Sequence, residues 1–186
     1  MPAQPWRNGG GSTRELLAWP PAGNWSLRIS MADISADGPF SAFPGIERWF
    51  AVLTGAGVAL AFPEGERRVL GGDPPFRFDG GAAPGCRLLD GPTRDLNLMQ
   101  RGGRATMRCT EAGRAWDEGF AMRGLFTVVP GRWAGGGAVR ALEAHALLWD
   151  DAAGPGGWAF VPDARDAAAA GWWLGFTPGN VSVPVQ

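Results

Sequence analysis

The chain has 186 residues, which is enough for one domain or two small fused ones with a sizeable hydrophobic core. Hydrophobic residues make up 45% of it and include 10 Trp and 10 Phe, which excludes an intrinsically disordered chain. The formal net charge of −1 gives no support to binding of nucleic acid or of an acidic membrane surface.

Alternating and apolar segments in the first two thirds of the chain predict β-strands. Apolar and polar residues alternate over residues 24–34 (NWSLRISMADI), which is typical of a strand, and again over residues 94–101 (RDLNLMQR). Residues 47–53 and 58–62 flank the turn 54–57 (TGAG), and this pattern predicts a hairpin. Segments rich in Gly and Pro separate these elements.

Beyond residue 124 the sequence becomes a series of short apolar segments between Gly and Pro turns. The segments LFTVVP, HALLWD, GWAFVP and GWWLGF each predict a short strand, and only residues 163–171 (DARDAAAAG) have a helix-forming composition. We therefore expect a mainly β chain with little helix. Residues 1–124 would form a first barrel with a Gly-rich N-terminal loop and a ligand site, and residues 125–186 a second half packed on it.

The signatures of the common enzyme classes are missing. His145 is the only histidine and lies in an apolar run, so we expect a core residue and no multi-histidine metal site. All 17 basic residues are arginine, and the lack of lysine excludes a Walker A loop and a Schiff-base mechanism. There is no GxSxG motif, and Gly55-Ala56-Gly57 lacks the third glycine of a dinucleotide fingerprint. We expect neither a metal nor a cofactor.

The sequence is typical of a reduced, cytoplasmic protein. Its N-terminus lacks the basic and apolar regions of a signal peptide, and no apolar run reaches the ~18 residues of a transmembrane helix. Cys86 and Cys109 have no metal-binding or redox spacing, although a disulfide between them stays open.

A set of polar side chains on this apolar scaffold is the candidate site. Each of them alone is compatible with an ordinary surface or turn position. A partly buried arginine needs a carboxylate partner, however, and a pocket that holds such an arginine can bind an anionic ligand instead. The candidate residues are Arg28 and Ser30 on one strand face, Asp95 and Asn97 on another, Arg48, and Asn8, Thr13 and Glu15 in the opening stretch.

The segments that carry these residues resemble the HutD/Ves family. The stretch PWRNGGGSTRE at residues 5–15 is similar to the family's PWKNGGGxTRE, with Arg7 where lysine is usual. The resemblance continues in order through WSLRISMADI, GPFSAFPGIERWFAVLTGAG, PFRFDG and RDLNLMQRGG, to about residue 103. Beyond that point only the general character is similar.

The resemblance implies a bicupin, in which two jelly-roll-like β-barrels are fused in one chain. Cupin enzymes hold a metal with histidines and a glutamate, but here Arg48 lies about where the glutamate would be. The resemblance therefore implies a barrel whose metal centre is replaced by an arginine and polar groups. HutD-like proteins are associated with bacterial histidine utilisation, and Ves-like proteins with stress responses.

Three classes of function remain open, and the first is binding without catalysis. Arg48 would hold a carboxylate or formyl oxygen, Arg28 would add charge, and Asn97, Ser30 and Thr13 would orient the ligand. The ligand would be a small anionic metabolite, and the family's link to histidine breakdown implies urocanate or a formylated or formiminated glutamate. Such a protein would modulate the pathway by sequestering or sensing an intermediate, and it is compatible with a homodimer.

The second class is a metal-independent isomerase or hydrolase. Glu15 or Asp95 would act as general base, and Arg48 would stabilise the developing oxyanion. A neighbouring arginine opposes the raised pKa that such a base needs, so we rank binding first. A stress-related interaction protein without a small ligand is the third alternative.

The Gly-rich stretch itself allows two hypotheses. Glycines 9–11 permit positive φ and close backbone approach, so the loop can fold against the mouth of the first barrel. Its N–H groups would then form an anion-binding nest, with Asn8 and Thr13 facing the ligand. The alternative is an N-terminal arm that only packs on the barrel or on a partner subunit.

Overall fold

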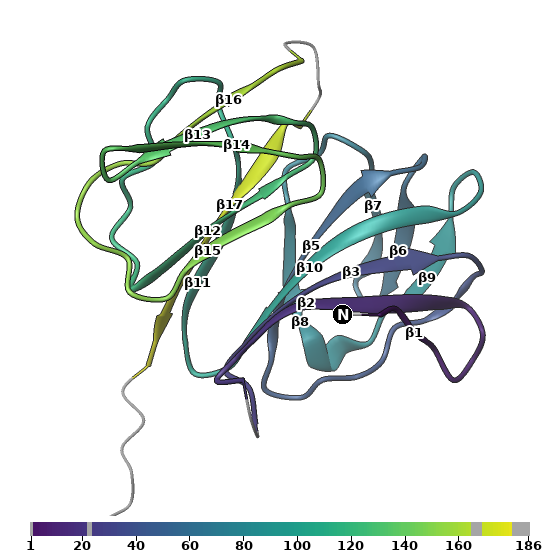
Figure 1. Ribbon diagram of the computed structural model, residues 1–186. Helices are drawn as coiled ribbons and strands as arrows, with labels where there is room; N and C mark the ends of the chain where they lie inside the picture. The colour runs from purple at the N-terminus through teal and green to yellow at the C-terminus, as the bar shows by residue number, and fades with distance from the viewer. Residues whose placement is uncertain (1, 22–23, 165–168, 180–186) are drawn as a thin grey trace, which may run out of the picture. The chain divides into compact units, whose positions relative to one another are not determined.

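The structure is a computed structural model that describes residues 2–21, 24–164 and 169–179. These residues form seventeen β-strands and a single 3-10 turn, η1 (Gly80–Ala82), so the chain is mainly β as expected. It divides into two compact units, Met1–Arg101 and Gly102–Gln186, and each unit has two antiparallel sheets of its own (Figure 1).

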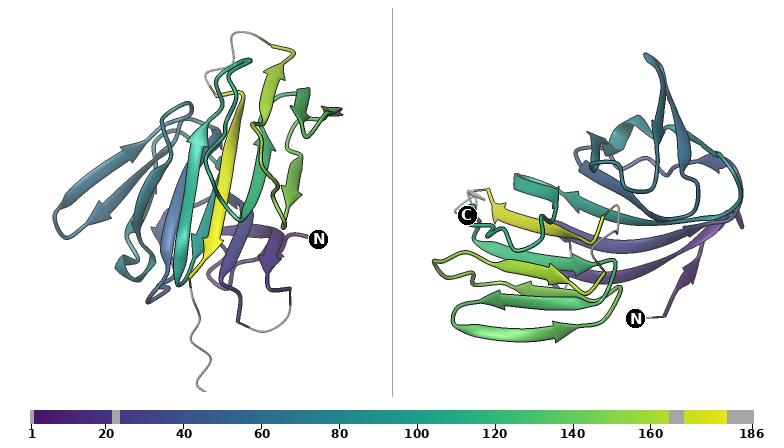
Figure 2. Two further views of the ribbon diagram at one scale, coloured as in Figure 1. Left: turned by 90° about the vertical axis from the view of Figure 1, so that its left-hand side faces the viewer. Right: turned by 90° about the horizontal axis from the view of Figure 1, so that it is seen from above.

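The first unit contains a six-stranded and a four-stranded sheet, which Figure 2 shows from two further sides. The alternating segments expected from the sequence are the two central strands of the larger sheet, β3 and β10, which pair along their whole length. The larger sheet has the order β1 (Gln4–Pro5), β2 (Gly11–Trp19), β3 (Leu27–Ile34), β10 (Thr93–Gln100), β5 (Glu47–Thr54) and β8 (Phe76–Asp79), and the smaller one β4 (Gly38–Pro39), β9 (Gly85–Leu88), β6 (Val58–Phe62) and β7 (Gly65–Val69).

The prediction of a hairpin around residues 54–57 is wrong, although both of the expected strands exist. β5 belongs to the larger sheet, whereas β6 belongs to the smaller one and makes its hairpin with β7. The glycine turn instead carries the chain from one sheet to the other. Gly55 has a φ of 95°, and a Cβ on it would lie 2.6 Å from the backbone oxygen of Pro92, so this corner requires glycine.

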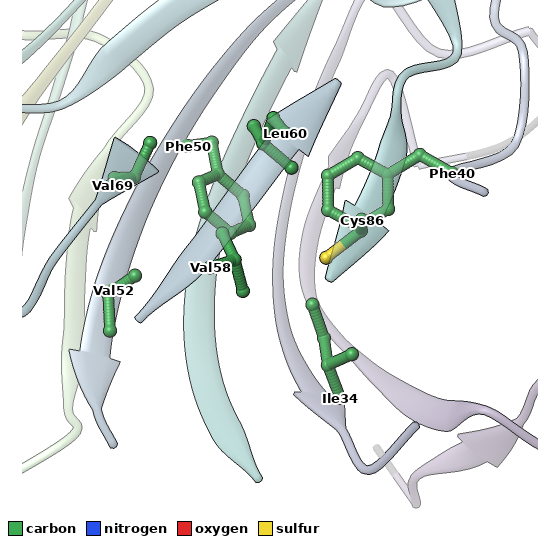
Figure 3. Packing of buried hydrophobic residues seen from close by; sticks show 8 residues of the cluster. All are labelled: Ile34, Phe40, Phe50, Val52, Val58, Leu60, Val69 and Cys86. Carbon is green, nitrogen blue, oxygen red and sulfur yellow. The ribbon is translucent and has the colours of Figure 1, made fainter. Parts of the chain in front are cut away.

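The two sheets of the first unit bury a common apolar core. Its fully buried side chains include Phe50 from the larger sheet and Leu60 from the smaller one. Removing each such side chain from water contributes about 1.5–3 kcal/mol. Figure 3 shows the eight residues of this cluster, which are Ile34, Phe40, Phe50, Val52, Val58, Leu60, Val69 and Cys86.

The second unit begins earlier than residue 124, where we expected the boundary. The reason is that β11 (Gly103–Cys109) pairs with β17 (Gly171–Pro178) at the far end of the chain, and β17 also pairs with β12 (Met122–Thr127). Residues 102–124 therefore belong to the second unit. The four-stranded sheet is completed by β15 (Leu147–Asp150) beside β12, and the three-stranded sheet has the order β14 (Ala138–Leu142), β13 (Gly131–Gly135), β16 (Ala159–Pro162).

The core of the second unit is mainly aromatic. Trp116 and Trp173 stack with ring centroids 5.4 Å apart, and Trp133 meets Trp158 edge to face at 5.1 Å. The four apolar segments expected to be strands overlap β12, β15, β16 and β17. The helix-forming stretch 163–171 includes residues 165–168, which lie outside the described residues.

Neither cysteine is in a disulfide: Cys86 lies in the core of the first unit and Cys109 in β11, both as free thiols. Within the described ranges, no helix has the length and apolar character needed to cross a membrane.

Candidate functional site: an arginine-lined cavity

A cavity of about 570 Å³ opens in the first unit. It is bounded by the turn between β1 and β2, by strands β3, β5 and β10, and by residues 39–43. The structure thus brings together residues from five separate parts of the chain. Six of the seven expected ligand-binding residues line the cavity, namely Asn8, Thr13, Arg28, Ser30, Arg48 and Asn97.

The strand register explains why these side chains meet. Met99 on β10 lies between Arg28 of β3 and Arg48 of β5, and Asn97 lies opposite Ser30 of β3. Because side chains of a strand alternate between its two faces, positions two apart point the same way. The row formed by Arg28, Met99 and Arg48 and the neighbouring row that contains Ser30 and Asn97 therefore face the cavity together.

Arg48 is the cation buried deepest in this wall, with 8% of its surface exposed. Its Nε and Nη2 both donate to Oδ1 of Asn97, at 2.9 and 2.6 Å. The ring centroids of Phe40 and Phe78 lie 4.2 and 5.4 Å from the guanidinium carbon. Burial lowers the pKa of Arg48 to about 10, so it remains charged at neutral pH.

The remaining edge of the Arg48 guanidinium is not used by the protein. Nη1 makes no hydrogen bond with any described residue, and no carboxylate of the described part lies within ion-pair distance of this side chain. The Nη1–Nη2 edge is the one that can donate two parallel hydrogen bonds to a carboxylate.

Arg28 differs from Arg48 because it has a carboxylate partner. Its Nε donates to Oε2 of Glu15 at 2.9 Å, and both side chains are partly exposed. Glu15 is not among the residues that line the cavity. The expected candidate base is therefore engaged in an ion pair.

Asp95 is the seventh expected residue, and it does not line the cavity. It points to the same face of β10 as Asn97 but is completely buried. Its Oδ2 accepts a hydrogen bond from Thr93 Oγ1 at 3.0 Å, while Oδ1 has no partner among the described residues. Burial raises the pKa of Asp95 to about 8, against the opposing effects of Thr93 and Arg48.

The N-terminal turn does line the cavity, but not as an anion-binding nest. The N–H of Gly9 donates to the backbone oxygen of Trp6 at 3.0 Å, and the N–H of Gly10 to Oδ1 of Asn8 at 3.0 Å. These amides are used within the turn. Trp6 closes it by donating from Nε1 to Thr13 Oγ1 at 2.7 Å.

The structure adds cavity residues that sequence reasoning missed. Trp6 and Arg7 belong to the quoted opening stretch, and Phe40 and Phe43 to the segment GPFSAFP, so the motifs themselves were the available signal. Arg7, Arg28 and Arg48 give the wall three cations, and no Asp or Glu is among its lining residues. The cavity is therefore electropositive, with aromatic sides.

A second cavity, in the second unit, differs from this one in size and in the charge of its lining. It has a volume of about 110 Å³ and is lined by paired charges, among them Arg114 with Glu111 at 2.7 Å. His145 is half-buried, not a fully buried core residue, and its ring stacks on Phe126 with centroids 6.2 Å apart. Within the described ranges, no three His, Cys, Asp or Glu side chains come together in a way that could hold a metal ion.

Comparison with known proteins identifies relatives over most of the chain. The HutD family model matches residues 1–154. Protein Ves of Citrobacter koseri is 34% identical over 153 residues, which cover 81% of this chain and 80% of that protein. The structure of HutD from Pseudomonas fluorescens SBW25, determined in a formate condition, has a TM-score of 0.82 and 29% identity, covering 95% of this chain and 93% of the other.

A more distant neighbour bears on the fold alone. Oxalate decarboxylase OxdC of Bacillus subtilis has a TM-score of 0.58 at 10% identity, covering 96% of this chain and 75% of the other. The fold is accordingly cupin-like.

Proposed function

The chain belongs to the HutD family, and on this premise we propose that it is a binding protein for a small carboxylate or formyl compound. The ligand occupies the arginine-lined cavity of the first unit, with its anionic group at Arg48. No metal takes part in holding it.

One observation carries this proposal: Arg48 is a buried cation that lines a cavity and has no carboxylate partner among the described residues. Burying an unpaired charge is costly, and proteins normally provide a carboxylate partner. Here the protein supplies the neutral oxygen of Asn97 and the faces of Phe40 and Phe78. A ligand carboxylate on the Nη1–Nη2 edge completes the pairing.

The other lining residues orient the ligand. Thr13 Oγ1 accepts from Trp6, so its own hydroxyl proton is available to the cavity. Ser30 offers a second hydroxyl, and Arg28 adds positive charge on the same wall. Aromatic side chains hold the apolar part of the ligand, as a few polar groups in an otherwise apolar pocket usually do.

At the level of the cell, the protein modulates histidine utilisation by sequestering or sensing an anionic intermediate in the cytoplasm. The support for this role is the name of the family and of the HutD structure from Pseudomonas fluorescens. The same relationship supports a bicupin in which each unit is one jelly-roll-like barrel.

A metal-independent isomerase or hydrolase is the second candidate. A pKa of about 8 at Asp95 favours it, since a general base works best near the ambient pH. Against it, Asp95 does not reach the cavity and Glu15 is paired with Arg28. Turnover that is lost in Asp95→Asn while binding survives would establish the enzyme.

The binding proposal is tested by a thermal-shift screen of the purified protein at pH 6.5. The ligands are formate, urocanate, glutamate, N-formylglutamate and N-formiminoglutamate. A ligand at 100 times its dissociation constant adds about 2.7 kcal/mol to the apparent stability. The shift should disappear in Arg48→Ala and persist in Arg68→Ala, which removes an exposed arginine of β7 in the same unit. Absence of a shift with every ligand contradicts the proposal and favours an interaction protein.

A further inference from the structure

Asp95 carries a buried carboxyl group on the same strand as Asn97, and the proposed binding of a ligand assigns no role to this group. It has no exposed surface, and one of its oxygens has no hydrogen-bond partner among the described residues. A buried ionised carboxylate would normally be paired or fully hydrogen-bonded. The surroundings of Asp95 therefore suit the neutral acid better than the anion.

The charged and titratable groups around Asp95 come from three neighbouring strands. Arg48 on β5 is the cation that acts on it, and Cys86 on β9 interacts with both. Burial raises the pKa of the Cys86 thiol to about 12, so it is uncharged in the physiological range. Asp33 on β3 lies on the outer face and is paired with Arg94 at 2.6 Å.

The protonation state of Asp95 decides how much of the Arg48 charge the cavity presents. With Asp95 neutral, no nearby anion offsets the guanidinium, and its free edge attracts a ligand carboxylate. With Asp95 ionised, a negative charge of the protein acts on the same guanidinium and repels the ligand. Burial raises the pKa of Asp95 to about 8, so the change falls just above neutral pH.

We propose that Asp95 links anion binding to a proton: the cavity holds its carboxylate ligand while Asp95 is protonated and releases it when Asp95 ionises. This inference rests on the proposed function of the cavity. The coupling is reciprocal, because a bound anion makes Asp95 harder to ionise to the same extent that ionisation weakens binding. Above the transition, each anion bound is accompanied by uptake of up to one proton from the solvent.

The test uses the full-length protein with sodium benzoate and sodium formate, which stay ionised throughout the range. Dissociation constants are measured from pH 6.5 to pH 9.5. In the wild type, we expect a constant dissociation constant at the acid end of the range. Above the pH at which Asp95 ionises, the dissociation constant should increase by up to about tenfold per pH unit. In Asp95→Asn the dissociation constant should change little with pH, because only the onset of Arg48 deprotonation, with a pKa of about 10, remains at the alkaline end of this range. Asp90→Asn, which makes the same change at an exposed position before β10, should behave as the wild type does.

A second variant covers the case in which Asp95→Asn does not fold. The hydroxyl of Thr93 donates to Asp95 and favours its ionised form, so Thr93→Val should shift the loss of affinity to higher pH. Calorimetry at pH 8.5 in two buffers of different ionisation enthalpy should also detect proton uptake by the wild type on binding.

The outcomes separate the two proposals. Binding at pH 6.5 that depends on Arg48 but does not weaken towards pH 9.5 overturns the proton linkage alone. The linkage is also overturned if the loss of affinity persists in Asp95→Asn, or if Thr93→Val leaves its midpoint unchanged. If neither probe binds at pH 6.5, or if Arg48→Ala binds both equally well, the proposed site itself is wrong and the linkage with it.

Discussion

Arg48 combines a position inside the first unit with a charge that the protein does not pair. A guanidinium tolerates this position better than an ammonium would, because it is more weakly hydrated and can lie against aromatic faces. Phe40 supplies such a face at 4.2 Å, and Asn97 holds the Nε–Nη2 edge. The side chain is thereby held with its other edge available.

Replacing the guanidinium of Arg48 by the single ammonium of a lysine tests the role of its paired donors. Arg48→Lys keeps one positive charge but loses the paired donors and the contact with Asn97. Because a hydrogen bond to a charged group contributes about 1.5–3 kcal/mol, we expect benzoate affinity to fall by about tenfold or more. Calorimetry at pH 6.5 measures this, with Arg68→Lys as the matched exposed control. Equal affinity in Arg48→Lys would show that charge alone is sufficient.

Asp95 also has a consequence for stability, independent of any ligand. Its pKa is raised from 3.8 to about 8 in the folded protein, so between these values the folded state retains a proton that the unfolded state releases. The stabilisation is complete below the unfolded pKa and is lost as the pH rises through the folded pKa. The limiting slope for one such group is about 1.4 kcal/mol per pH unit.

Asp95→Asn should therefore be more stable than the wild type near pH 8, and the difference should shrink as the pH falls to 5. Urea unfolding followed by tryptophan fluorescence at several pH values gives the two stability curves. A constant difference between wild type and variant over this range would mean that Asp95 titrates normally in the folded state.

The turn between β1 and β2 is the element that brings the N-terminus to the cavity. Gly11 makes this possible, because a Cβ there would lie 2.3 Å from the backbone oxygen of Asp33 and 3.1 Å from the Trp6 ring. Trp6 then reaches Thr13, and Asn8 closes the turn on Gly10. The glycine run is thus explained by close packing at Gly11 and a φ of 72° at Gly9.

Gly11→Ala should consequently damage both the turn and the site. We expect a loss of about 1–3 kcal/mol in the free energy of unfolding, as is typical of overpacking, together with weaker benzoate binding. Gly10→Ala is the matched control, since a Cβ there would meet nothing closer than 3.4 Å. Unfolding in urea and calorimetry measure the two effects. Similar behaviour of the two variants would remove the special role of Gly11.

Elements were predictable from the sequence where their signal is local. The alternation in β3 and β10 is such a signal, because each strand places polar groups on one face and apolar groups on the other. The pairing of β5 with β6 was predicted wrongly, because a glycine turn between two strands does not reveal whether the strands remain in one sheet. The corner at Gly55 is determined by the nearby backbone of Pro92.

The whole molecule separates into two units, and the candidate site lies in one of them. Every residue that lines the larger cavity precedes Arg101, the last residue of the first unit. Each unit also has its own apolar core. Ligand binding at the candidate site can therefore be detected by its effect on the backbone amides of the first unit.

Hydrogen exchange followed by mass spectrometry should detect this effect. Benzoate at pH 6.5 should slow exchange in peptides from residues 4–13 and from β3 and β5, which line the cavity. We expect little change in β12 and β17, and none anywhere in Arg48→Ala. Protection restricted to the second unit would place the ligand elsewhere.

The sequence by itself determined the mainly β class, the family and most residues of the candidate site, because six of the seven expected ligand-binding residues line the cavity. These depend on local alternation, on motifs read in order and on composition. Only the tertiary structure decided that Arg48 meets Asn97, 49 residues along the chain, that Asp95 is sealed from the cavity, and that β11 joins the second unit. Burial and cross-strand neighbours set these features, because both arise from pairing between distant segments.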